Sequence, residues 1–318
     1  MQRLKDDRGA VSVMVALLIV PLIAFAAIAI DVAAMWADKQ QLQTGADAGA
    51  LAVAQDCAQN ACADPAYTAQ TLAAANVNDG GATAAITDPQ LNTLTPSSGS
   101  VTVQTSGTRE HWFAPVLGID QSTITTEATA GWGAPTGGTA VLPVAFSLCE
   151  FLDQTGGGLP SGTTERTIFF TKSSGTSCTG PSNNFVPGGF GWLTVNGGSC
   201  QTTSAIDDVL WSDTGENVPS GCTTADFAAV QNQTVLLPIF DDTGGTGSSA
   251  WYRLYGYAAF TITGYHFVGQ YSWSADGACK GSVRCVQGYF TEFVDLTDAF
   301  DYGTSAPQLG ASVVSLTS

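Results

Sequence analysis

The sequence predicts an α+β protein in which a long N-terminal helix precedes a small α+β unit and a mainly antiparallel β domain. Three observations support this fold class. An uncharged apolar run covers Ala10–Ile30, and an Ala- and Gln-rich stretch without proline follows at 32–55. Beyond about residue 139, short runs rich in Val, Thr and aromatic residues alternate with clusters of Gly, Pro and Ser, which is typical of strands joined by turns.

These patterns divide the chain into six parts. We expect a cytoplasmic tail at 1–9, a transmembrane helix at 10–30, an extracytoplasmic helix continuing the span at 31–60, a small α+β unit at 61–131, a linker at 132–138 and a disulfide-rich β domain at 139–318.

The uncharged run is long enough to cross a bilayer. Its 21 residues form a helix about 32 Å long, which matches a hydrocarbon core of about 30 Å. Arg3, Lys5 and Arg8 precede the run, whereas only Lys39 follows it closely, so the N-terminus is expected in the cytoplasm and the rest outside. A cleaved secretory signal is the alternative, but the apolar sequence continues to Ile30 and favours a retained single-pass anchor in the cell membrane.

The helix is expected to continue beyond the membrane with one unusually small-sided face. Gly45, Ala46, Gly49 and Ala50 are the candidate helix-packing residues, because small side chains let helix backbones approach closely. Two alternatives remain open for this face: packing against its own domain, or a helix–helix assembly surface between molecules.

All eight cysteines follow the apolar run, which predicts disulfides in an oxidising compartment. The absence of a CxxC pair argues against a metal site. Close spacing favours two local bridges, and two further pairs are guesses. The four expected bridges are Cys57–Cys62, Cys279–Cys285, Cys149–Cys178 and Cys200–Cys222.

Charge and motifs exclude several functions. The net charge of −17 opposes binding to nucleic acid. The sequence has no G-x-S-x-G, P-loop or H-E-x-x-H motif and only two histidines, so we expect no enzyme, no catalytic residues and no cofactor. Asp241 and Asp242 are weak Ca²⁺ candidates, with a solvated acidic loop as the alternative, and the same alternatives apply to Asp207-Asp208. Asp295 and Asp298 are a weak candidate for the carboxylate pair of a glycosidase.

The β domain contains six strand candidates and a late aromatic cluster. The cluster, residues 251–273, suits a β core, although a carbohydrate-stacking face is the alternative. Asp207–Glu216 is expected to form a helical or turn insertion, and Thr223 to cap a short helix. The strand candidates are Ala140–Leu148, Thr167–Lys172, Phe190–Val195, Thr234–Phe240, Trp251–Phe267 and Val283–Val294.

The N-terminal region resembles TadG-like Flp (tight adherence) pilus-assembly proteins over about residues 7–56. The runs that carry this resemblance are Asp7-Arg8-Gly9-Ala10-Val11-Ser12-Val13, Ile30-Asp31-Val32 and Lys39-Gln40-Gln41-Leu42-Gln43-Thr44-Gly45-Ala46-Asp47-Ala48-Gly49-Ala50-Leu51-Ala52. A weaker similarity extends to about residue 130. The family implies a bitopic membrane protein of the pilus machinery without enzymatic chemistry. Cleavage after Gly9 would put Met14 where prepilins carry Glu, which argues against prepilin processing.

Two functions follow from these patterns. The first is a structural or accessory protein of Tad/Flp-type pilus assembly, with other pilus-assembly or pseudopilin proteins as partners. The alternative is a surface adhesin or glycan-binding module on a membrane anchor, with a surface glycan as its ligand.

Overall fold

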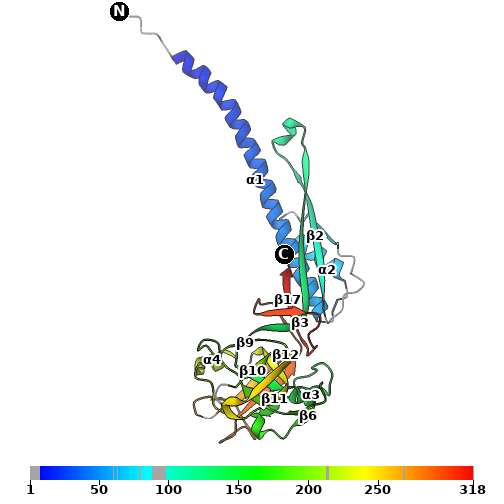
Figure 1. Cartoon of the computed structure of the whole chain (residues 1–318). Coiled ribbons are helices and arrows are strands. Elements are labelled where there is room, and N and C mark those ends of the chain that lie inside the picture. Colours follow the sequence, from blue (N-terminus) through cyan, green and yellow to red (C-terminus); the bar gives the residue numbers. More distant parts are fainter. Residues whose placement is uncertain are drawn as a thin grey trace, which may run out of the picture.

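A long, largely apolar N-terminal helix is joined to an elongated folded part. The computed structural model describes residues 8–59, 61–62, 64–78, 80–87, 98–212, 215–267 and 269–317. Helix α1 (Arg8–Ala58) runs 51 residues without a break. A long hairpin of β2 (Ser98–Glu110) and β3 (Gln121–Ala140) lies beside α1, and a compact β domain occupies the far end of the molecule (Figure 1). The α+β class expected from the sequence is confirmed.

The remaining elements are mostly short strands. They are α2 (Pro65–Ala75), β1 (Thr83–Ile86), η2 (Ala114–Leu117), β4 (Val144–Ser147), α3 (Leu148–Thr155), β5 (Arg166–Phe169), η3 (Thr171–Ser173), β6 (Ser177–Thr179), β7 (Phe185–Pro187), β8 (Phe190–Trp192), β9 (Thr202–Ala205), β10 (Val209–Trp211), α4 (Thr224–Ala229), β11 (Thr234–Gly244), η4 (Gly247–Ser249), β12 (Trp251–His266), β13 (Ser272–Trp273), β14 (Cys285–Thr291), β15 (Phe293–Asp295), β16 (Phe300–Gly303) and β17 (Ala311–Thr317).

The first sheet has the order β1-β2-β3-β17-β15, with β9 and β16 paired to the end of β3. The β2–β3 ladder is antiparallel from Glu110↔Gln121 to Ser98↔Gly133. Inward-facing residues of this sheet pack on α1 and α2 in a core of small side chains. Its buried members are Ala46, Ala50, Val53, Ala54, Cys57, Ala69, Val101, Val103, Ala128, Ala130, Trp132 and Val314.

Residues 132–138, which the sequence suggests as a linker, are instead the second half of β3. The glycines have a packing role there, because β16 crosses this part of the strand at close range. A Cβ on Gly131 would collide with the hydroxyl of Tyr302, and one on Gly133 would lie 2.9 Å from the carbonyl oxygen of Gly303. Glycine in a strand often marks such a close backbone approach, so the composition typical of a linker has a different cause here.

The second sheet forms a barrel in the order β5-β14-β12-β11-β4-β8. A bridge between Phe170 and Phe190 links its two edges, and Thr171 Oγ1 donates to the carbonyl of Phe190 at the same seam. Most pairs are antiparallel, with β4–β11 parallel. Buried rings fill the interior, among them Phe146, Phe151, Phe190, Trp192, Phe260, Phe267 and Phe290.

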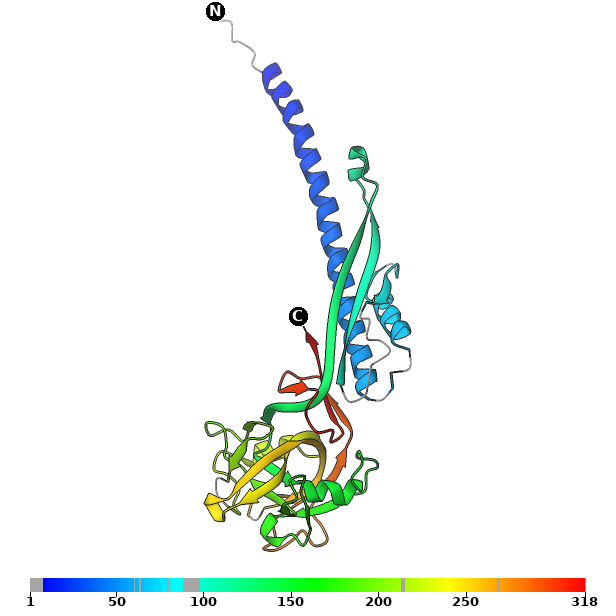
Figure 2. The same ribbon diagram turned by 45° about the vertical axis from the view of Figure 1, so that its right-hand side comes forward.

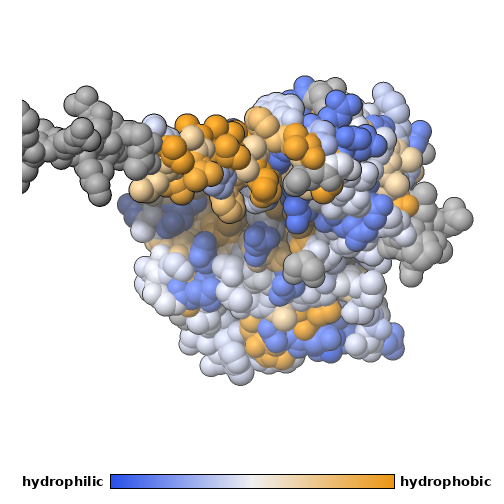
Figure 3. All heavy atoms as spheres, turned by 90° about the horizontal axis from the view of Figure 1, so that it is seen from above, coloured by the Kyte–Doolittle hydropathy of each residue, from blue (hydrophilic) through white to orange (hydrophobic). Residues whose placement is uncertain are grey.

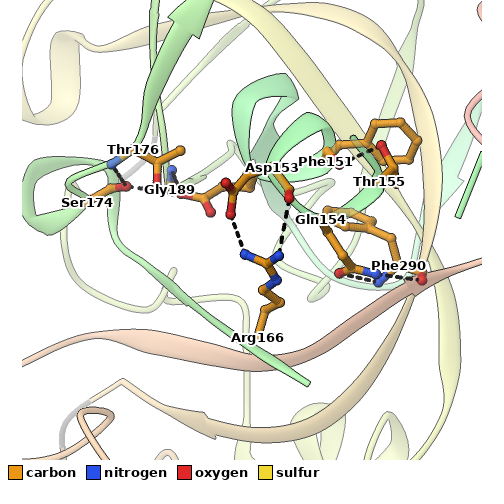
Figure 4. A network of polar contacts seen from close by, with 10 residues as sticks. Phe151, Asp153, Gln154, Thr155, Arg166, Ser174, Thr176, Gly189 and Phe290 are labelled. Carbon is orange, nitrogen blue, oxygen red and sulfur yellow. Dashed lines mark hydrogen bonds and ion pairs between the residues drawn. The ribbon is translucent and has the colours of Figure 1, made fainter. Parts of the chain in front are cut away.

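Helix α3 is fastened to the barrel by polar side chains (Figure 4). Gln154 forms a reciprocal pair of hydrogen bonds with the backbone of Phe290, at 2.9 and 3.0 Å. Arg166 on β5 forms an ion pair with Asp153, and Glu150 accepts from the backbone N–H of Gly189 at 2.6 Å. These contacts join one short helix to three separate segments of the barrel.

Several local features expected from the sequence can be compared with the structure. The four disulfides join the pairs expected from the sequence: Cys57–Cys62, Cys149–Cys178, Cys200–Cys222 and Cys279–Cys285. Thr223 and Asp226 form a capping box at the start of α4. The expected insertion at Asp207–Glu216 is a turn followed by strand β10, with residues 213–214 outside the described part.

Candidate functional site: the membrane anchor and its stalk

Within the described residues, one helix is long and apolar enough to cross a membrane. None of its most apolar window is buried in the protein, and large side chains such as Leu17, Val20 and Phe25 are more than half exposed. Seen from above, apolar residues gather on one part of the molecule while polar residues cover most of the remaining visible face (Figure 3). Arg3 and Lys5, on which the orientation depends, lie outside the described residues.

Asp31, the first residue after the apolar run, holds the tip of the β2–β3 hairpin. Its carboxylate accepts hydrogen bonds from the backbone N–H groups of Trp112, Phe113 and Ala114, at 3.0, 3.0 and 2.8 Å. Desolvation raises the pKa of this carboxyl, but the three N–H donors and the nearby His111 outweigh it, so the pKa of Asp31 is lower than usual. The carboxylate that follows the apolar run therefore binds the backbone of the hairpin tip.

The hairpin is attached to α1 at two further levels. Arg109 forms an ion pair with Asp38, with 3.2 Å between Nη1 and Oδ2. We call the part of α1 after residue 30, together with α2 and the β2–β3 hairpin, the stalk. Deeper in the stalk, the buried hydroxyl of Thr105 donates to the carbonyl of Leu42 at 2.9 Å. The polar contacts therefore continue from the end of the span into the small-residue core.

The small-sided face of α1 packs against α2 and β2 of the same chain. A Cβ on Gly45 would lie 3.1 Å from the Cα of Ala73 in α2, and one on Gly49 would lie 3.4 Å from both the Cα of Ala69 and Cγ1 of Val103. Ala46 and Ala50 are fully buried in the same core.

Of the two alternatives for this face, the structure of the single chain favours packing against its own domain. Helix α2 and strand β2 cover the face, so the helix that meets it belongs to the same molecule. The Cys57–Cys62 disulfide lies at the end of α1, just before α2 begins. A surface for another molecule has to be sought elsewhere on the stalk.

The acidic candidates of the β domain have protein partners. Asp241 is almost fully buried and receives two hydrogen bonds from Arg253, both at 3.0 Å. These hydrogen bonds raise the pKa of the guanidinium, which burial opposes. Asp242 accepts from the N–H of Thr243 at 2.9 Å. The pair considered for Ca²⁺ is thus engaged in contacts within β11 and β12.

The other carboxylates and the aromatic cluster also have structural roles. Asp208 accepts from the backbone of Ala205, and Asp295 accepts from the N–H and hydroxyl of Thr297. Most rings of the aromatic cluster are buried, including Tyr252, Tyr257, Phe260, Tyr265 and Phe267. These rings are therefore unavailable as a carbohydrate-stacking face. Trp211, outside that cluster, is 55% exposed.

Asp31 occurs in the run Ile30-Asp31-Val32 that carries the family resemblance, but neither Asp31 nor Arg109 was assigned a contact from the sequence. The only local signal was a carboxylate directly after an uncharged run, and its partners lie about eighty residues away in the sequence. Such a pairing becomes visible only when the hairpin is placed beside α1.

No curated protein and no solved structure matches the chain. A family model described as putative Flp pilus-assembly TadE/G-like matches residues 9–56, which is nearly the whole of α1. The part of the chain that forms the span and the small-residue stalk is therefore similar to TadE/G-like proteins of Flp pilus assembly, which confirms the resemblance found in the sequence.

Proposed function

We propose that this chain is a bitopic cell-envelope protein that serves Tad/Flp-type pilus assembly in a structural or accessory role without catalysis. In this proposal residues 1–9 lie in the cytoplasm, residues 10–30 cross the membrane and the ectodomain lies outside. Other pilus-assembly or pseudopilin proteins are its partners. The proposal rests on the family match over residues 9–56 together with the apolar helix that the matched segment forms.

One observation carries the proposal furthest: the span and the stalk are a single helix. The exposed apolar half of α1 passes without interruption into the half whose small residues are buried under α2 and β2. Because one helix forms both parts, no loop separates the proposed membrane anchor from the ectodomain. That continuity suits a scaffold that presents its ectodomain at a fixed place on the membrane.

A non-catalytic role is supported by how the polar side chains are used. Asp241 is held by Arg253, Asp295 by Thr297 and Asp208 by the backbone N–H of Ala205. Each of these contacts stabilises a strand end or a turn. The proposed work of this chain is therefore to position and hold other proteins.

The direct test is pilus assembly in cells that lack this chain. We expect pili to be lost without it and restored by the full chain, but not by residues 31–318 secreted without an anchor. Normal pili in cells without the chain would refute the proposal. Normal pili with a loss of surface attachment would instead favour the adhesin or glycan-binding alternative.

Cells that express the full chain can also be used to test the topology. Protease added to intact spheroplasts should remove the mass C-terminal to residue 31, because that part is proposed to lie outside the membrane. A cytoplasmic protein serves as the matched control for spheroplast integrity. Complete protection of the chain in intact spheroplasts, with digestion after lysis, would contradict the proposed orientation.

A further inference from the structure

The tip of the β2–β3 hairpin is apolar and exposed. The N–H of His111 donates to the carbonyl of Asp120 at 2.9 Å and closes the tip loop, and no charged residue occurs at 112–119. Val116 is 89% exposed, Trp112 67% and Ile119 52%. Loop tips in water are usually polar, whereas a contiguous exposed apolar patch marks an interaction site.

The position of this tip is fixed relative to the span. Asp31, which follows the last residue of the apolar run, binds the backbone N–H groups of Trp112, Phe113 and Ala114. Both ribbon views show the hairpin rising alongside α1 toward its N-terminal half (Figures 1 and 2). The loop beyond these N–H groups therefore lies near the end of the membrane-spanning segment.

A second contact fixes the direction in which the tip points. Arg109 pairs with Asp38, seven residues after Asp31, and seven helical residues span about 10 Å. The three residues from Arg109 to Trp112 can span up to about 10 Å as well. The two attachments therefore hold this part of β2 nearly parallel to α1, with the chain running toward the membrane as its residue numbers increase.

The composition of the tip suits the boundary between lipid headgroups and acyl chains. Trp and other aromatic residues are enriched at this depth because a large apolar ring can be buried while its polar edge stays hydrated. The Arg109 guanidinium lies 5.2 Å from the centre of the Trp112 ring. Trp36, on α1 between the two attachment points, is 64% exposed and adds a second tryptophan near this level.

We propose that residues 112–119 insert into the extracytoplasmic interface of the same bilayer that α1 crosses. This inference rests on the proposed span, because the tip reaches lipid only if residues 10–30 lie in the membrane. The protein is then held at two points, by a helix through the bilayer and by a hairpin dipped into its surface. Two points prevent the ectodomain from rotating freely about the helix axis.

Lipid-dependent fluorescence of the full chain in phosphatidylcholine nanodiscs tests the inference. All eight cysteines form disulfides, so Val116→Cys supplies a free thiol for an environment-sensitive NBD label. The matched control is Phe185→Cys in β7, an equally apolar site that is 72% exposed on the barrel. We expect a blue-shifted emission at position 116 that doxyl-labelled lipids quench, and no lipid quenching at position 185.

A third label separates the two proposals. Val20→Cys lies in the middle of the apolar run and should be quenched by deep doxyl lipids if α1 spans the bilayer. Quenching at position 20 together with water-like emission at position 116 would overturn the hairpin inference alone. No quenching at position 20 would overturn the span on which it rests. A tip that docks on another protein would also give water-like emission in these single-chain nanodiscs and would count against lipid insertion.

Discussion

The stalk and the barrel have cores of opposite construction. In the stalk, α1, α2 and β2 meet through Gly, Ala and Val, and the backbones themselves are close. In the barrel, rings fill the space between strands, with Phe260 set edge-on to Phe146 and Phe290 at centroid distances of 4.8 and 5.0 Å. The stalk core has no room for added atoms, whereas removing a ring from the barrel core would leave a cavity.

Truncating a barrel ring should produce the largest effect. Phe260 is fully buried, so Phe260→Ala removes its packing and leaves a cavity, which typically costs about 3–5 kcal/mol. Denaturant unfolding followed by near-UV circular dichroism measures the loss. The control is Phe185→Ala, whose side chain is 72% exposed, with an expected change within about 0.5 kcal/mol. Equal effects at the two positions would contradict the dependence of the barrel core on its buried rings.

Enlarging a stalk residue should have a smaller effect of the same sign. Gly49→Leu adds atoms where a Cβ alone already meets Ala69 and Val103, and overpacking typically costs about 1–3 kcal/mol. The melting temperature of the full chain in nanodiscs should therefore fall. The matched control is Ala37→Leu on the exposed side of the same helix.

The opposite outcome for Gly49→Leu is a rise in the melting temperature. Leu is a better helix former than Gly by roughly 0.5–1 kcal/mol, so a helix without close neighbours would be stabilised by this change. A raised melting temperature would show that the backbones of α1 and α2 are not in close contact.

Loss of the Asp31 charge, by acidification or by Asp31→Asn, should have the smallest effect, confined to the junction between Asp31 and the hairpin. The folded-state pKa of Asp31 is below its ordinary value, so its contribution to stability is complete above about pH 4. That contribution is lost as the pH falls through the folded pKa. We expect faster hydrogen exchange at the N–H groups of Trp112–Ala114 in Asp31→Asn than in the wild-type chain at neutral pH.

A variant at the neighbouring His111 serves as the control for Asp31→Asn. His111 donates to or accepts from Ser122 through Nε2 at 2.8 Å, and its charge also acts on Asp31. His111→Gln should leave most of the protection at 112–114 intact, because the three N–H donors remain. Unchanged exchange in Asp31→Asn would show that the carboxylate does not hold the tip.

Much of the fold was predictable because its causes are local. The 21-residue uncharged run and the proline-free stretch after it predicted α1, and apolar and aromatic runs bounded by turn residues placed β11 and β12 to within a few residues. The resemblance over about residues 7–56 also depended on a continuous segment, and the match at 9–56 confirmed it.

The less predictable features depend on contacts between distant segments. Gly131 and Gly133 suggest a flexible linker until Tyr302 and Gly303 are placed against them. The small face of α1 left two partners open, because composition does not show which helix covers it. Asp31 and the hairpin tip are separated by about eighty residues, so nothing near either one in the sequence indicates their pairing.

Strand β3 makes the connection between the anchor and the barrel a mechanical one. It runs from the hairpin tip, past α1, to its pairing with β9 and β16 next to the barrel. Its hydrogen bonds lie across the strand, so a pull on the barrel away from the membrane loads many of them at once, in shear. Bonds loaded in shear must break together, whereas bonds loaded from one end separate one by one. We therefore expect the β2–β3 ladder to resist extension along the length of the molecule.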